Sequence, residues 1–151
     1  EAFLSNSSNE IRKICHLVET IRHSYGSNAE VMFKPHPGDG NSYVYLKDFA
    51  NVLPGTIPFE LLVIRMLKMS KIINIYTYGS TAVLSSLFIS EERRRFKIRM
   101  IKSHNFDSFH PRANKKFIML LEHLVGDDYE EIDIDSLPKN RFCTTGKVSS
   151  V

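Results

Sequence analysis

The chain has 151 residues, an ordinary share of apolar residues and a net charge of +3. This length fits one domain, or one half of a larger two-part enzyme, and the apolar residues suffice for a core. The mild charge does not favour a nucleic-acid-binding protein, which would carry a dense basic stripe with interleaved aromatic residues.

The sequence also disfavours a membrane-spanning or secreted protein. Charged residues interrupt the apolar stretch Phe59–Met69, and no apolar run reaches membrane-spanning length. The first residues lack the basic start and the long apolar centre of a secretory signal. Cys15 and Cys143 are too few for a disulfide framework, so we expect a reducing, cytoplasmic compartment.

The histidines do not form a convincing metal-binding pattern. His104 and His110 lack a cysteine or carboxylate at the spacing of a zinc site, and His16, His23 and His123 lie within predicted helices. We therefore expect no metal cofactor.

The first half of the chain predicts one helix and two short strands. Apolar residues recur at helical spacing over Asn9–Ser24, and a strand is expected over Ala29–Lys34. The segment Ser42–Phe49 is expected to be a turn of helix or irregular. A second short strand is expected over Asn51–Leu53, ended by Pro54 and Gly55.

In the second half, predicted helices and strands alternate. They are a helix over Pro58–Met69, a strand over Lys71–Tyr78, a helix over Ala82–Ile89, a strand over Phe96–Ile101, a helix over Asn114–Val125 and a strand over Ile132–Leu137. Alternation of this kind is typical of βαβ units, so we expect an α/β fold with a mostly parallel sheet flanked by helices.

Two charged blocks stand out in this half. "RRRFKIR" (Arg93–Arg99) is basic and "DDYEEIDID" (Asp127–Asp135) is acidic. Most such blocks are solvated surface. A second interpretation of the basic block is attraction to anionic substrates or to membrane head groups.

Three loops follow the carboxyl ends of predicted strands: Lys34–Gly40, Leu53–Glu60 and Tyr78–Thr81. In open α/β sheets, ligands bind in the crevice beyond those ends. We therefore interpret the three loops as one binding site.

The first loop, "KPHPGDG", places a histidine between two prolines. Proline lacks an N–H and fixes φ, so Pro35 and Pro37 present His36 on a stiff loop outside any sheet. The imidazole can carry charge beside a phosphate or give a proton to a leaving oxygen, and Lys34 adds a second positive charge. The simpler interpretation is an exposed histidine without a function.

The other two loops open helices. Gly79, Ser80 and Thr81 form an anion pocket if the N–H groups of the helix start and the two hydroxyls face a phosphate, but Ser80 alone could simply cap its helix. Glu60 could accept two hydrogen bonds from a ribose, or it could only complement the dipole of its helix.

The segments "FKPHPGD", "LPGTIPFELL" and "YTYGSTAV" resemble, in this order, the C-terminal half of bacterial sialyltransferases of the lipooligosaccharide and capsule type. The resemblance covers roughly Val31–Leu87. It implies a GT-B fold of two Rossmann-like halves facing each other across a cleft. Residues 1–151 would then be the donor-binding half, without the N-terminal half.

The resemblance also implies roles for individual residues. His36 would bind the phosphate of CMP-sialic acid and assist the departure of CMP, on a loop fixed by Pro37. Glu60 would hold the ribose hydroxyls. The remaining implied donor-binding residues are Lys34, Gly79, Ser80 and Thr81 near the phosphate, and the backbone of Leu53, Pro54 and Gly55 at the cytosine.

The implied reaction moves sialic acid from CMP-sialic acid to a sugar hydroxyl of a surface polysaccharide or lipooligosaccharide. No metal is required, since positive charge, a proton donor and helix N–H groups can stabilise the leaving phosphate. The implied partners are a glycan acceptor and the missing half, which would supply the general base, together with a peripheral contact at the inner face of the membrane.

Two alternatives stay open at this point. One is another nucleotide-linked glycosyl or polyol-phosphate transferase, since similar loops serve other donors and fold alone cannot name the donor. The other is a non-catalytic interaction domain in which the three loops only connect strands and helices and the charged blocks are contact surfaces. Titrations with different nucleotides distinguish another transferase from a sialyltransferase. A tight protein partner together with a lack of nucleotide binding would favour the interaction domain.

Overall fold

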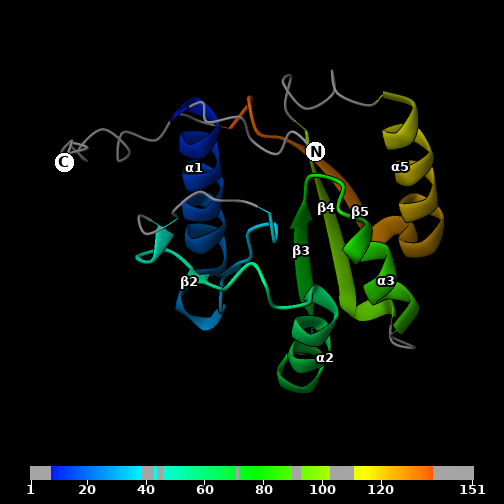
Figure 1. Cartoon of the computed structure of the whole chain (residues 1–151), viewed down its shortest axis with the longest axis horizontal. Coiled ribbons are helices and arrows are strands. Elements are labelled where there is room, and N and C mark those ends of the chain that lie inside the picture. The colour runs from blue at the N-terminus through cyan, green and yellow to red at the C-terminus, as the bar shows by residue number, and fades with distance from the viewer. Residues whose placement is uncertain are drawn as a thin grey trace. The chain divides into compact units, whose positions relative to one another are not determined.

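The structure, a computed structural model, describes residues 8–38, 43, 46–70, 72–89, 93–102 and 111–137 (Figure 1). The chain divides into two compact units. The described residues up to Thr56, with Leu137, belong to the first unit, and the second unit runs from Ile57 to Ser136.

The first unit contains one long helix and a small parallel sheet. Helix α1 (Ser8–Tyr25) is followed by a 3-10 turn and by strand β1 (Met32–Phe33), which pairs in parallel with β2 (Asn51–Val52). The buried face of α1 carries Ile14 and Val18, which the helical spacing of apolar residues predicts, and also Leu17. Among the described residues of this unit, Tyr43, Leu46 and Ala50 are buried as well.

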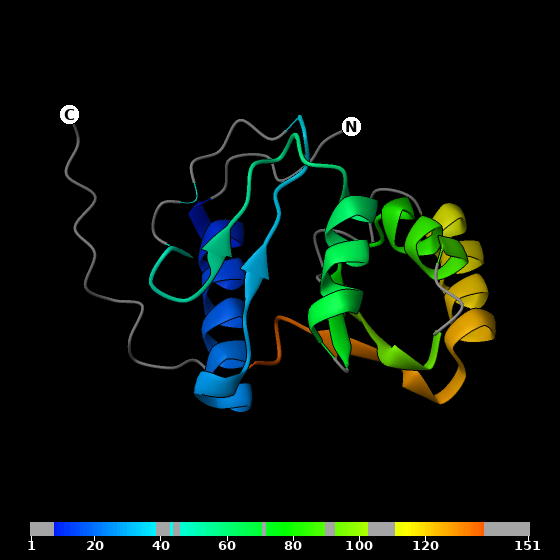
Figure 2. The same ribbon diagram turned by 90° about the horizontal axis from the view of Figure 1, so that it is seen from below.

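The second unit is a three-stranded parallel sheet covered by helices. Its elements are α2 (Phe59–Met69), β3 (Ile73–Thr77), α3 (Thr81–Ile89), β4 (Phe96–Lys102), α5 (Pro111–Val125) and β5 (Tyr129–Asp133), with strand order β3-β4-β5. Since neighbouring parallel strands are consecutive, right-handed crossovers place α3 and α5 on the same face of the sheet (Figures 1 and 2).

Alternation along the strands builds the core of the second unit. Ile73, Ile75 and Thr77 of β3 are buried, and the residues between them are only partly covered. The core cluster joins strand residues to one or two residues of each helix: Val63, Ile73, Ile75, Val83, Leu87, Phe96, Ile98, Met100 and Leu121. The predicted α/β fold, with parallel strands flanked by helices, is confirmed.

The two charged blocks contribute to neighbouring strands. β4 pairs with β5, and ion pairs join Arg99 to Glu130 at 3.0 Å and Lys102 to Glu131 across the two strands. A further ion pair joins Lys97 of β4 to Asp128 in the 3-10 turn before β5. The last strand lies at Tyr129–Asp133, so its predicted position at Ile132–Leu137 is wrong. Acidic residues are poor strand formers by themselves, but here the cations of β4 stabilise their carboxylates.

Two further residues of these blocks have specific contacts. Arg95 donates hydrogen bonds to the carbonyls of Leu67 (2.6 Å) and Ser70, and so satisfies the end of α2. The Tyr129 hydroxyl donates to Glu131 Oε1 at 3.1 Å. Burial, followed by the negative charge of Glu131, raises the pKa of Tyr129, so this phenol stays neutral and acts as a donor.

Other boundaries differ modestly from the predictions. The strand expected over Ala29–Lys34 is limited to Met32–Phe33, and α5 begins at Pro111 because proline suits the first helical position. Asp39, Gly40, His104, His110 and Cys143 lie outside the described residues. None of the described helices has both the length and the hydropathy needed to cross a membrane.

Candidate functional site

The loops that follow β1 and β2 lie against each other in the first unit. Because the two strands are parallel neighbours, their carboxyl ends meet at one edge of the small sheet. Lys34 Nζ donates hydrogen bonds to the carbonyl oxygen of Gly55 at 3.0 Å and to that of Pro35 at 3.1 Å. The lysine ammonium therefore ties one loop to the other.

His36 is exposed, and its ring is oriented by its own loop. The backbone N–H of Gly38 donates to His36 Nδ1 at 3.1 Å. A ring nitrogen that accepts a hydrogen bond carries no proton, so the neutral imidazole bears its proton on Nε2. Pro35 and Pro37 restrict the backbone on both sides of this residue.

Gly55 allows the two loops to touch. A Cβ atom at this position would lie 3.0 Å from the carbonyl oxygen of His36 and 3.4 Å from Cα of Pro37. Both are backbone atoms, which cannot move aside as a flexible side chain can. Glycine therefore suits a close approach of two backbones, next to the histidine that the sequence singled out, and a larger residue would push the His36 backbone away by a few tenths of an ångström.

In the second unit, the predicted anion loop connects β3 to α3. Gly79 has a positive φ of 99°, a conformation that favours glycine. Ser80 Oγ accepts a hydrogen bond from the N–H of Ala82 at 3.3 Å, so Ser80 caps α3. Ser80 and Thr81 are exposed, and a hydroxyl that accepts from the backbone can still donate its own hydrogen to a ligand.

Thr77 is a residue of this loop that the sequence analysis did not identify. Its Oγ1 accepts hydrogen bonds from the N–H groups of Gly79 (3.2 Å) and Ser80 (3.1 Å), and only 7% of the residue is exposed. The signal was present, since a threonine at the last inward-facing position of a strand can bond the turn that follows. The N–H groups of Gly79 and Ser80, which precede the helix, are thus already bonded to Thr77.

Glu60 lies in the first turn of α2 and is partly exposed. Pro58 precedes this helix without a side-chain cap, so a carboxylate at Glu60 complements the open N-terminus. α2 packs against α3, the helix opened by Ser80 and Thr81.

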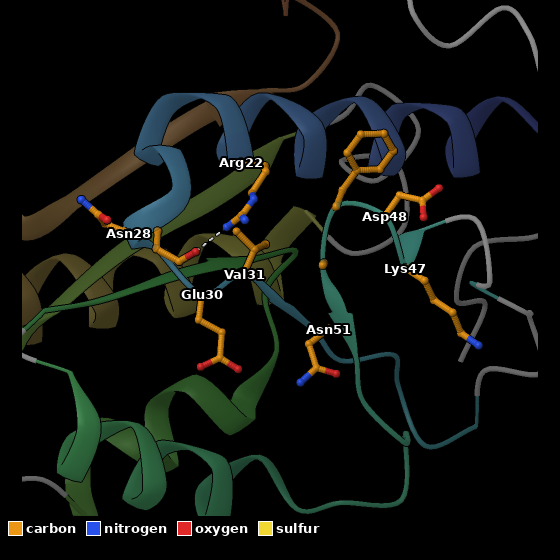
Figure 3. Close-up of a pocket in the computed structure, with 10 residues that line it drawn as sticks. Arg22, Asn28, Glu30, Val31, Lys47, Asp48 and Asn51 are labelled. Atoms are coloured by element: carbon orange, nitrogen blue, oxygen red, sulfur yellow. Dashed lines mark hydrogen bonds between the residues drawn. The ribbon is translucent and has the colours of Figure 1, made fainter.

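A hollow in the described part of the first unit lies elsewhere. It has a volume of about 430 Å³ and is open to solvent, and its lining includes Arg22, Glu30, Lys47, Asp48 and Asn51 (Figure 3). None of the predicted site residues lines it. The Arg22 guanidinium donates to the carbonyl of Ala29, which holds the segment before β1 against α1.

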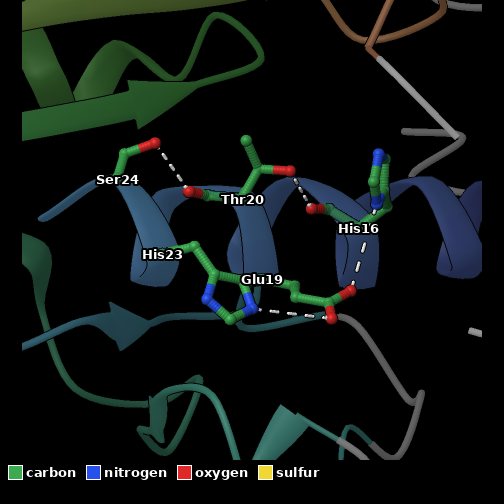
Figure 4. Close-up of polar contacts among 5 residues, drawn as sticks. All are labelled: His16, Glu19, Thr20, His23 and Ser24. Carbon is green, nitrogen blue, oxygen red and sulfur yellow. Dashed lines mark hydrogen bonds and ion pairs between the residues drawn. The ribbon is translucent and has the colours of Figure 1, made fainter. Parts of the chain in front are cut away.

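A buried carboxylate on α1 was also not predicted. Glu19 is 5% exposed, and its oxygens lie 4.0 Å from His16 Nδ1 and 3.8 Å from His23 Nε2 (Figure 4). These distances indicate ion pairing when a ring is protonated. Within the described residues, no three histidine, cysteine or acidic side chains are grouped so that they could hold a metal ion.

The predicted site residues therefore form two local groups. The first unit contains Lys34, His36, Pro37, Pro54 and Gly55, and the second contains Glu60, Gly79, Ser80 and Thr81.

Comparison of the chain with protein-family models, curated proteins and solved structures gives no match.

Proposed function

We propose that this chain is the CMP-binding half of a sialyltransferase-like GT-B glycosyltransferase. The proposal is supported by the three motifs in their order and by a parallel sheet flanked by helices, which is the architecture of Rossmann-like halves. It predicts that the loops of both units contact one nucleotide.

The orientation of His36 is the observation that carries this proposal. With Nδ1 occupied by the N–H of Gly38, the ring is set to donate from Nε2. In the proposed reaction, the bond between the anomeric carbon of sialic acid and the phosphate oxygen breaks, and CMP departs as a phosphate monoester. A hydrogen bond from Nε2–H stabilises the charge that develops on that oxygen.

The hydroxyls of Ser80 and Thr81 would hold the same phosphate. Because Thr77 already occupies the N–H groups of Gly79 and Ser80, hydroxyl donors replace backbone donors as the main contacts of this loop. The acceptor hydroxyl oxygen would form a bond to the anomeric carbon as CMP leaves, and its proton would pass to a base in the other half of the enzyme. The 151-residue chain should therefore bind nucleotide weakly and catalyse little, since positioning of the reactants needs both halves.

Titration of the ¹⁵N-labelled chain with CMP tests the proposal, with the amide signals of Gly38, Gly55 and Gly79 as reporters. We expect CMP to shift these signals more strongly than CDP, UDP or GDP at equal concentration. His36→Ala should weaken the response to CMP, whereas His123→Ala, at an exposed position on α5, should not. Equal responses to all four nucleotides would favour a different transferase, and no response would contradict nucleotide binding.

A further inference from the structure

Lys34 has an arrangement that its expected role as a phosphate neighbour does not explain. Its ammonium has three N–H donors, and two of them are directed at the carbonyl oxygens of Pro35 and Gly55. One of these oxygens belongs to its own loop and the other to the loop after β2, 21 residues away. We call these two hydrogen bonds the Lys34 bridge.

The Lys34 bridge lies beside a tight backbone contact. Gly55 provides the carbonyl that Lys34 bonds, and the same residue approaches the carbonyl of His36 so closely that a Cβ atom would be only 3.0 Å away. The Lys34 bridge holds the two loops together, and the absence of a side chain at Gly55 lets their backbones come into contact. Both act on the backbone that carries His36.

From these contacts, we infer that Lys34 and Gly55 are positioning residues that hold His36 with Nδ1 toward the N–H of Gly38. The prolines restrict φ on each side, the Gly38 hydrogen bond fixes the ring, and the Lys34 bridge keeps the loop on its support. The catalytic meaning of this arrangement rests on the proposed function, but the positioning of the ring does not.

The competing role for Lys34 is direct binding of a phosphate. A direct ligand would change the affinity for CMP and leave the ligand-free loop unaltered. A positioning residue would change the ligand-free loop itself. The two roles are therefore separated by measurements on the chain without nucleotide.

Lys34→Met removes the donors and keeps most of the side-chain stem. Charge-assisted hydrogen bonds contribute more than neutral ones, so we expect local opening to increase and the Gly38 amide to exchange about tenfold faster with solvent. The ring ¹⁵N signals of His36 should shift as Nδ1 loses its donor. Lys47→Met is the matched control, since Lys47 is exposed in the same unit and should leave both signals unchanged.

Lys34→Arg tests rescue by a conservative change. The guanidinium can donate to two carbonyls, so the His36 and Gly38 signals should return toward those of the unaltered chain. Gly55→Ala should shift the same signals, because its methyl group meets the backbone of His36.

Unchanged His36 and Gly38 signals in ligand-free Lys34→Met, together with weaker CMP binding, would overturn the inference in favour of a direct phosphate ligand. Unchanged signals in Gly55→Ala would also overturn the role of Gly55. If the unaltered chain does not bind CMP but Lys34→Met moves the His36 signals, the proposed function fails and the positioning stands.

Discussion

Thr77 shows how one buried oxygen can determine the shape of a candidate ligand loop. Its Oγ1 accepts from two consecutive N–H groups, those of Gly79 and Ser80, in a place where water has little access. Without this oxygen, both donors would be left unsatisfied or would have to turn toward solvent. The same oxygen therefore stabilises the turn that leads into Ser80 and Thr81.

Thr77→Val keeps the side-chain shape and removes the acceptor. We expect a loss of about 1 kcal/mol in the free energy of unfolding, because two part-buried hydrogen bonds lose their acceptor. Urea denaturation followed by circular dichroism measures it. Ser85→Ala, at an exposed position on α3, should change the free energy of unfolding by less than about 0.5 kcal/mol. Equal stabilities of the two variants would show that the Thr77 hydrogen bonds contribute nothing net.

Glu60 allows the proposed ribose contact to be tested separately from helix stability. Glu60→Gln keeps an oxygen acceptor but removes the charge and one of the two equivalent oxygens that a vicinal diol would bond. If the carboxylate holds the ribose, the preference for CMP over deoxy-CMP should fall in the variant, by about tenfold for a lost charge-assisted hydrogen bond. Calorimetric titration of both nucleotides measures this ratio, and a preference equal to that of the unaltered chain would leave Glu60 only its place in the helix dipole.

At the scale of elements, the β4–β5 pair explains why the last strand was predicted at the wrong residues. Acidic residues are poor strand formers, so "DDYEEIDID" read singly predicts solvated surface, and Glu130 and Glu131 are indeed exposed. Next to β4, each of Glu130 and Glu131 faces a cation of the neighbouring strand. Long-range pairing of this kind cannot be read from a local pattern.

Arg99 should contribute most among these cations. It bonds Asn74 Oδ1 and Glu130 Oε2, its guanidinium lies 5.4 Å from the centre of the Tyr76 ring, and its side chain is 17% exposed. We expect Arg99→Met to lower the free energy of unfolding by about 1–2 kcal/mol, because the partly buried Asn74 loses its donor and the exposed Glu130 loses its ion pair. Lys97→Met, which removes a pair exposed to 43% and 37% at 3.9 Å, should cost less than about 1 kcal/mol. Urea denaturation of both variants gives the comparison, and equal losses would mean that burial of Arg99 adds nothing.

Local patterns did predict most elements of the fold, whereas the roles of the site residues stay a prediction. Helical spacing predicted α1 within a residue at each end, a β-branched and aromatic run predicted β3, and alternation predicted β4. Patterns did not predict contacts that depend on the packed structure. The Lys34 bridge joins residues from two loops, and the close approach at Gly55 depends on the register of β1 with β2. Such contacts follow from pairing distant segments, for which one sequence carries no local signal.

At the scale of the whole molecule, the proposed function requires residues of both compact units to contact the same nucleotide. His36 and Gly38 belong to one unit, and Gly79 and Ser80 to the other. If one CMP molecule is held by both groups, a single binding event must perturb the amides of Gly38 and Gly79. Their chemical-shift changes should then follow the same saturation curve and give one dissociation constant.

His36→Ala supplies the decisive comparison. It removes a contact in one unit, but it should weaken the response of Gly79 in the other by the same factor as the response of Gly38, since both signals report the same bound nucleotide. Ser80→Ala should act in the reverse direction, weakening the response at Gly38. Two different dissociation constants, or a variant that affects only the signals of its own unit, would show two independent weak sites. A common cytidylate site would then be excluded, even if each loop binds a phosphate by itself.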